Sequence, residues 1–247
     1  MAIKTTLNYS PNFNPIKRSA KKIKFIIFHY TGMEKESDTI NRLTNIQSKV
    51  SSHYLIKNNG EILTLVPDMY VAWHAGESSW KNYISLNKNS IGIEISNPGH
   101  EFNYKKFSNK QVSSLLKLTK FLIKKYKVNL INILGHSDIA PARKKDPGEK
   151  FPWKYLAKNK VSLWHTLNGR VLAKNRTLKV NKLEEKDFLN NLFKIGYSKK
   201  GLKNLNKVKY ATFVIKAFQR RFRPVLINGK IDKECFIISK NLLKNYH

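Results

Sequence analysis

The segment Leu134-Gly-His-Ser-Asp-Ile-Ala-Pro-Ala-Arg-Lys-Lys-Asp-Pro-Gly148 contains one histidine after an apolar run and, ten residues later, an aspartate in a loop with two prolines. A strand ending at His136 would direct a ring nitrogen into a cleft, and the loop would return the Asp146 carboxylate to the same point. A second apolar run, Phe25-Ile-Ile-Phe28, ends in the same way at His29. Two imidazoles and one carboxylate leave a fourth tetrahedral position open for water, which distinguishes catalytic zinc sites from closed structural ones. The pattern therefore predicts a metal site formed by these three residues.

Two other histidines leave alternatives for this ligand set. His53 lies between a serine and a tyrosine, and His74 follows a tryptophan. Each could replace one of the three ligands. A single histidine at the end of a strand can equally be a hydrogen-bonded polar residue, so the metal site depends on the three positions taken together.

The chain is strongly basic, with 47 lysine and arginine residues, 16 acidic residues and a formal net charge of +31. Such a charge predicts an acidic polymer as partner, which nucleic acid, an anionic membrane surface or an anionic cell wall could supply. Only eight of the basic residues are arginine, so a solvated lysine surface, typical of an AT-rich genome, is the alternative. A nucleic-acid-binding protein would show basic residues interleaved with exposed aromatics, or a known binding fold. The sequence shows neither, and we expect no nucleic-acid partner.

Hydrophobic residues make up 41% of the 247 residues, enough for a packed core in one or two domains. The single cysteine, Cys235, excludes an intramolecular disulfide. No signal-peptide pattern is visible, and no apolar run is long enough to span a bilayer. The sequence alone therefore predicts a soluble protein made in the cytoplasm, and it defines no oligomeric state.

Hydrophobic periodicity predicts an α/β fold with a mixed central sheet flanked by helices. The apolar run 23–28 is typical of a strand covered on both faces. Asn58-Asn-Gly60 predicts a hairpin turn between two strands within 52–66. Residues 109–127 have apolar positions at helical spacing and predict a long amphipathic helix on one sheet face. Further elements are expected at 38–50 (helix), 90–96 (strand), 131–134 (strand) and 151–156 (short helix).

The composition changes near residue 168, which divides the chain into domains. Residues 1–22 are polar and basic and predict an ordered N-terminal arm, followed by a catalytic domain at 23–167. Residues 168–180 lack periodicity and predict a linker. Residues 181–247 predict three helices in a small all-α domain, which about 60 residues can just support.

Five motifs follow one another along the chain. They are Ile27-Phe-His-Tyr-Thr31, Ser52-His-Tyr-Leu-Ile56, Ala72-Trp-His-Ala-Gly76, Ser90-Ile-Gly-Ile-Glu-Ile-Ser96 and Gly135-His-Ser-Asp-Ile-Ala-Pro-Ala-Arg-Lys-Lys-Asp-Pro-Gly148. In this order they resemble the zinc-dependent N-acetylmuramoyl-L-alanine amidases, or amidase type 2 family. The C-terminal helices resemble the small peptidoglycan-binding domain that one branch of this family carries. The resemblance implies a bacterial hydrolase of cell-wall turnover or recycling.

The resemblance also implies catalytic roles. The ligands of Zn²⁺ would be His29, His136 and Asp146. Glu94 lies inside an otherwise apolar strand, where a structural ion pair is the default interpretation; the family implies a general base there, with a pKa raised by burial. Lys144 would stabilise negative charge on the carbonyl oxygen, with Lys145 as the adjacent alternative.

Three further residues are expected beside the cleft. Trp73 or His74 would contact the glycan or peptide of the substrate, although Trp73 could instead serve ordinary packing. His53 is interpreted as a buried, hydrogen-bonded neighbour of the site and is also a candidate for substrate contact. In the C-terminal domain, three arginines would either bind the wall or form a solvated face: Arg220, Arg221 and Arg223.

The implied reaction is hydrolysis of the amide bond between the lactyl group of N-acetylmuramic acid and L-alanine, in peptidoglycan or muropeptides. A recognition protein that binds without cutting typically lacks part of the ligand set, which this chain retains. A wall-binding domain adds effective concentration only for an enzyme that acts on polymeric wall, so the domain favours the cell envelope or periplasm. The absence of a visible signal peptide favours the cytoplasm as the alternative.

Overall fold

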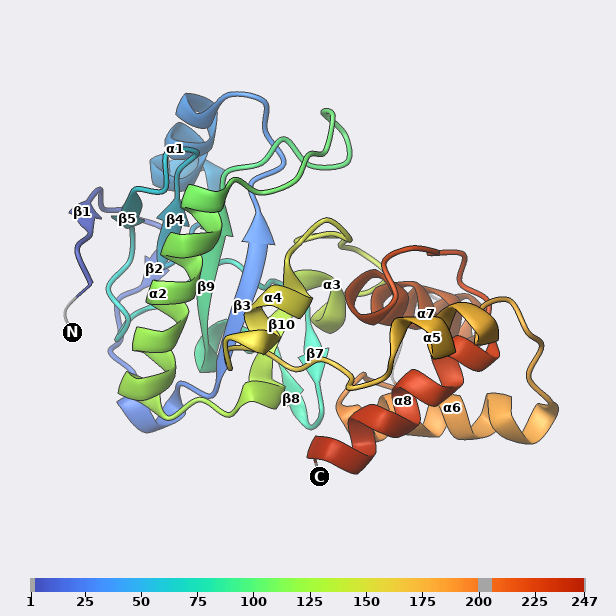
Figure 1. Cartoon of the computed structure of the whole chain (residues 1–247). Coiled ribbons are helices and arrows are strands. Elements are labelled where there is room, and N and C mark those ends of the chain that lie inside the picture. The colour runs from blue at the N-terminus through green and yellow to red at the C-terminus, as the bar shows by residue number, and fades with distance from the viewer. Residues whose placement is uncertain (1–2, 200–205, 247) are drawn as a thin grey trace.

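The computed structural model describes residues 3–199 and 206–246 (Figure 1). Residues 1–2 of the expected arm, and 200–205 and 247 of the expected C-terminal domain, lie outside this described part. At its centre is a six-stranded sheet in the order β1-β5-β4-β9-β3-β10. Strands β4 and β5 run antiparallel and the other neighbours run parallel, which confirms the predicted mixed sheet. The strands are β1 (Thr6–Leu7), β3 (Phe25–Tyr30), β4 (Tyr54–Ile56), β5 (Ile62–Thr64), β9 (Ser90–Ile95) and β10 (Ile133–Gly135).

The described helices surround this sheet and continue into the C-terminal domain. They are α1 (Glu36–Thr44), α2 (Asn109–Tyr126), α3 (His136–Ile139), α4 (Trp153–Lys158), α5 (Gly169–Asn175), α6 (Lys182–Ile195), α7 (Lys207–Phe222) and α8 (Lys233–Tyr246). The predicted long amphipathic helix is confirmed by α2, which begins at a capping box of Ser108 and Gln111. The helix expected at 38–50 is shorter, because α1 ends at Thr44 and a 3-10 turn, Ile46–Ser48, follows it.

Alternation along β3 divides its side chains between the two faces of the sheet. Ile26 and Phe28 belong to the core beneath α2, which lies along one face of the sheet in Figure 1. Phe25 and Ile27 belong to a second core on the opposite face. His29 continues this second series. The sequence predicted that His29 follows the end of this strand. The strand extends through Tyr30, so His29 lies within β3 instead.

The face opposite α2 is covered in two places. Helix α1 packs over β4 and β5 through Leu43, Leu55 and Leu63. The C-terminal helices share a core with β3 and β10. Strand β9 lies between β4 and β3, and its isoleucines face α2, so alternation turns Ser90, Gly92 and Glu94 toward the opposite face. This face carries the candidate site.

The N-terminal arm is ordered, as predicted, because it pairs with the sheet. Strand β1 adds to β5 at one edge of the central sheet. Strand β2 (Phe13–Asn14) pairs with β6 (Val71–Ala72) in a separate two-stranded sheet. A second small sheet, β7 (Ser79–Trp80) with β8 (Tyr83–Ile84), packs toward the C-terminal domain through Trp80.

The C-terminal domain contains the three predicted helices α6, α7 and α8. Helix α5 forms within the predicted linker 168–180, behind an Asn168 cap, and contacts α8, and the sequence pattern did not predict this helix. Short helices gain stability from tertiary contacts, which a single-sequence pattern does not reveal. Phe188 and Phe218 of this domain share one core with Phe25 and Trp80 of the catalytic domain. The two domains are therefore packed together.

The three clustered arginines at the C-terminal end of α7 are buried, so neither expectation for them is confirmed. Arg220, Arg221 and Arg223 are 9%, 3% and 2% exposed. Arg221 pairs with Asp138, and Arg223 lies 3.3 Å from a carboxylate oxygen of Asp232. Because a buried guanidinium requires such partners, Arg221 serves packing between the domains and Arg223 serves packing within the C-terminal domain. Among the described helices, none combines the length and apolar character that crossing a bilayer requires.

Candidate active site

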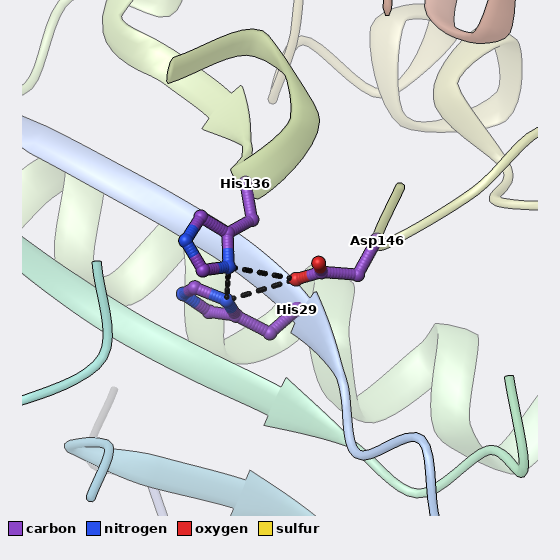
Figure 2. Close-up of side chains that lie close together, drawn as sticks. All are labelled: His29, His136 and Asp146. Atoms are coloured by element: carbon purple, nitrogen blue, oxygen red, sulfur yellow. Dashed lines mark hydrogen bonds and ion pairs between the residues drawn. The ribbon is translucent and has the colours of Figure 1, made fainter. Parts of the chain in front are cut away.

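Three side chains meet at the positions predicted for a metal site (Figure 2). His29 Nδ1 lies 3.0 Å from His136 Nδ1 and 3.0 Å from Asp146 Oδ2, and the latter two atoms are 3.1 Å apart. Ligand atoms of a tetrahedral zinc ion, each about 2.0–2.1 Å from it, lie about 3.3 Å from one another. Within 3–199 and 206–246, no other trio of histidine, cysteine or acidic side chains meets in this way. The geometry thus favours His29, His136 and Asp146 over sets that include His53 or His74.

Each ligand position is fixed by its own backbone. His29 lies in β3, and His136 begins α3 directly after β10, whose residues pair with β3. Asp146 lies in the following loop, and its carbonyl oxygen accepts a hydrogen bond of 2.8 Å from the Ser137 amide. This bond holds the loop against the turn that carries His136, so the two ligands are positioned together.

Burial sets the protonation of these groups. Burial and the charge of His136 lower the pKa of His29 to about 4. Burial alone would raise the pKa of Asp146, but the neighbouring His136 and His29 outweigh it and lower that pKa. At neutral pH His29 is therefore neutral and Asp146 ionised, which are the forms that bind a metal ion.

Hydrogen bonds to Nε2 fix the orientation of both imidazole rings, His29 and His136. His29 Nε2 lies 3.0 Å from His74 Nδ1, and His74 Nε2 lies 3.1 Å from Ser90 Oγ. With Nδ1 of His29 facing the other ligands, its Nε2 carries the proton and donates to His74. His136 Nε2 donates to the carbonyl oxygen of Ala75 at 3.1 Å. Both rings therefore present Nδ1 to one point, as metal-ligating histidines do when an outer partner fixes the tautomer.

Glu94 faces this point from the neighbouring strand. In the pairing of β3 with β9 it lies opposite His29, and it lines the cleft with the three ligands. Its Oε2 is buried without a hydrogen-bond partner among the described residues. Burial, and then the charge of Asp146, raise the pKa of Glu94 well above its ordinary value, and Lys144 opposes this in part. A structural carboxylate would have its oxygens matched, so the geometry favours a general base.

The cleft has a volume of about 410 Å³ and carries several cations. Lys144 and Lys145 both line it, and Lys144 is the less exposed of the two. Arg42 of α1 and Arg143 also line the cleft, and neither was predicted from the sequence as a site residue. The signal for Arg143 was its place in the same loop as Lys144. Arg42 had no such signal, since it reaches the cleft only because α1 packs on β4 and β5.

The interpretation of His53 as a buried, hydrogen-bonded residue is confirmed, and because it does not line the cleft, its contact with substrate stays a prediction. His53 is 0% exposed. Its Nδ1 accepts from the Gly92 amide at 3.0 Å, and its Nε2 lies 2.9 Å from Arg18 Nη2. His74 lines the cleft, but both of its ring nitrogens are engaged by protein groups. Trp73 is 37% exposed and lies outside the cleft lining, so its contact with substrate stays a prediction.

The sequence pattern of the N-acetylmuramoyl-L-alanine amidase family matches residues 19–149, more than half of the chain. The chain belongs to this family. It is 35% identical over 237 residues to N-acetylmuramoyl-L-alanine amidase AmiD of Escherichia coli (strain K12). The aligned region covers 91% of this chain and 84% of AmiD. It is 41% identical over 113 residues to 1,6-anhydro-N-acetylmuramyl-L-alanine amidase AmpD of Haemophilus influenzae, which covers 45% of this chain and 59% of AmpD.

Solved structures show the same relationship across both domains. The complex of E. coli AmiD with anhydro-N-acetylmuramic acid-L-Ala-D-gamma-Glu-L-Lys has a TM-score of 0.79 at 34% identity, covering 94% of this chain and 93% of that one. AmpDh3 of Pseudomonas aeruginosa in complex with anhydromuramic pentapeptide has a TM-score of 0.78 at 29% identity, covering 94% of each chain. The fold likeness therefore includes the C-terminal helices as well as the sheet.

Proposed function

We propose that this protein hydrolyses the amide bond between the lactyl group of N-acetylmuramic acid and L-alanine in muropeptides, and that it does so with zinc. The observation that carries the proposal is the triangle of His29, His136 and Asp146 with the unmatched carboxylate of Glu94 beside it. Family membership supports the reaction. The relatives crystallised with anhydro-muramic peptides support soluble muropeptides as the substrate class.

The residues present fit a zinc ion. Two imidazole nitrogens and one carboxylate oxygen converge within 3.1 Å of one another, and burial holds His29 neutral. Zinc bound there would act as a Lewis acid that lowers the pKa of water and polarises a carbonyl. Three protein ligands leave the open position that a catalytic site requires.

Glu94 and Lys144 then divide the remaining work. Glu94 Oε2 takes a proton from the attacking water as the water oxygen bonds to the amide carbon. The Lys144 ammonium stabilises the negative charge that grows on the carbonyl oxygen, for which a point charge suffices. When the carbon–nitrogen bond breaks, Glu94 returns the proton to the departing amino group of L-alanine. The raised pKa of Glu94 suits it to both transfers near neutral pH.

The test is incubation of the purified chain with anhydro-N-acetylmuramic acid-L-Ala-D-gamma-Glu-L-Lys, with products identified by mass spectrometry. The proposal predicts two products, the free sugar acid and a tripeptide that begins at L-alanine. Loss of activity with a chelator and its return with zinc would support the metal. A protein that binds this compound but leaves it intact would instead be a recognition protein.

We propose further that residues 181–247 bind polymeric wall and that the enzyme works at the cell envelope. The resemblance of these helices to a peptidoglycan-binding domain supports the first part. Pull-down of the whole chain on insoluble sacculi, over a range of salt concentrations, tests it. Retention only at low salt would point to nonspecific attraction by the positive charge. Fractionation of the producing cells tests the location.

A further inference from the structure

Asp138, two residues beyond His136, is a buried carboxylate whose charge is matched from the other domain. It is 1% exposed. Its Oδ2 accepts from the Gly135 amide at 2.8 Å and from Arg221 Nη1 at 2.6 Å, and its Oδ1 accepts from the Tyr197 hydroxyl at 2.8 Å. Both side chains described as its partners therefore belong to the C-terminal domain. Without them the carboxylate would be a buried, largely unmatched charge, which is unfavourable.

Arg221 contacts the chain on both sides of His136. Besides its bond to Asp138, its Nη2 donates to the carbonyl oxygen of Ile133 in β10 at 2.9 Å. Its guanidinium lies 4.3 Å from the centre of the Trp153 ring. A planar guanidinium fixes the relative position of two acceptors because its donors form a rigid fork. Arg221 thus bonds both to the strand that ends before His136 and to the turn that begins there.

The domain contact around Tyr197, the second side-chain partner of Asp138, is tightly packed. A Cβ at Gly196 would lie 2.3 Å from the Trp80 ring, and the Lys81 amide donates to the Gly196 carbonyl oxygen at 2.7 Å. The Tyr197 ring lies 4.9 Å from the ring of Trp80. Because this contact is close, it fixes the segment after α6, which brings the Tyr197 hydroxyl to Asp138 in the turn. The Ser137 amide donates a hydrogen bond to the Asp146 carbonyl oxygen. This bond links the position of the turn to that of the second candidate metal ligand.

We propose that the C-terminal domain is a working part of the metal centre, with Arg221 and Tyr197 as positioning residues that act on His136 through Asp138. The inference rests on the proposed zinc site. It assigns a role in that site to residues beyond the family-matched segment 19–149.

The test compares two full-length variants, Arg221→Met and Arg223→Met. Arg223 is the matched control, because it is equally buried near the same end of α7 but lies against Asp232 within its own domain. Zinc affinity is measured by competition with a chelator, and the visible spectrum of the cobalt-loaded protein reports ligand geometry. We expect Arg221→Met to weaken zinc binding by up to about 10-fold, the lower end of the effect of removing a direct outer partner, because Arg221 acts on His136 through Asp138. The cobalt spectrum should change, and kcat should fall more than KM rises.

Arg223→Met should be less stable than the wild type but should keep its zinc affinity and cobalt spectrum. Tyr197→Phe removes one hydroxyl and no charge, so it tests the same path if Arg221→Met does not fold, and it should shift both readouts in the same direction. Wild-type zinc affinity in folded Arg221→Met, or in Tyr197→Phe when Arg221→Met is unfolded, would overturn the inference. Equal weakening in Arg223→Met would do the same. A wild-type protein that binds no zinc would instead refute the metal site itself.

Discussion

Replacing Glu94 by glutamine should separate its catalytic role from its effect on stability. Glutamine has nearly the same shape, but it cannot accept a proton from water. Since the general base acts only in the transition state, zinc affinity and KM should stay near wild type while kcat falls. Loss of a positioned base typically costs about 10²- to 10⁴-fold in rate, which corresponds to about 2.7–5.4 kcal/mol of activation free energy.

The structure predicts a second effect in the opposite direction. In the metal-free protein the pKa of Glu94 is raised well above its ordinary value of 4.5. When the pKa of a carboxyl is higher in the folded than in the unfolded protein, the free energy of unfolding decreases as pH rises above the unfolded-state pKa. This happens because the unfolded chain releases the proton first. Glutamine carries no charge at any pH, so Glu94→Gln should raise the free energy of unfolding at neutral pH. The gain should vanish below about pH 4.5, where both states are protonated.

The assay is steady-state hydrolysis of the soluble muropeptide, combined with denaturant unfolding of the metal-free protein. Glu101→Gln is the control, because Glu101 lines the same cleft but is exposed, and we expect less than about a tenfold change in its rate. Near wild-type turnover in Glu94→Gln would refute the general-base assignment. A lower stability at neutral pH would show that Glu94 is matched in the folded protein.

Four other changes test separate parts of the structure. Asp146→Ala should lose zinc because one of three ligands is gone, and full occupancy by metal analysis would refute the ligand set. Gly92→Ala would place a Cβ 2.4 Å from His74 Cγ, so the free energy of unfolding should fall by about 1–3 kcal/mol and chelator competition should show a weaker zinc affinity. Wild-type values of both would mean that the His74 ring can move aside without cost. Burial would raise the pKa of Asp68, but hydrogen bonds from two tyrosines and a lysine lower it below 3.8. Asp68→Asn should therefore reduce the free energy of unfolding at neutral pH, and the difference from wild type should shrink as pH falls through the folded-state pKa. Denaturant titrations at several pH values would contradict this if the difference were constant. Removing 168–247 should eliminate cooperative unfolding and hydrolysis of the soluble muropeptide, because the sheet face over β3 and β10 loses its cover; a folded, active fragment by circular dichroism and turnover would refute the shared core.

The sequence was most informative where chemistry and local pattern coincide. His29 and His136 were recognisable because each closes an apolar run, and parallel strands bring such positions to one region of a sheet. Glu94 was recognisable as a candidate site residue because a carboxylate inside an apolar strand is unfavourable unless it has a partner or a function. The helix at 109–127 was recognisable because its apolar spacing is regular over many turns.

The sequence was least informative about contacts between distant segments. Nothing local distinguishes Arg221, which turns inward to Asp138, from an arginine on a solvated face. The partner lies 83 residues earlier in the chain. Asp138 did carry a usable signal, because a carboxylate two residues after a candidate metal ligand in a buried turn needs a matching donor. Helix α5 was missed because its stability comes from the contact with α8 and not from its own residues.

The shared core between the domains changes what a second binding surface could do for this enzyme. A module on a flexible tether samples many positions and raises the local concentration of bonds of every spacing. Here α5 and the packing of Trp80 against Tyr197 and Gly196 hold the C-terminal domain at one distance and one angle from the cleft. If residues 181–247 bind wall as proposed, a glycan strand held by both domains would therefore present to the cleft only the amide bond that lies at this fixed spacing.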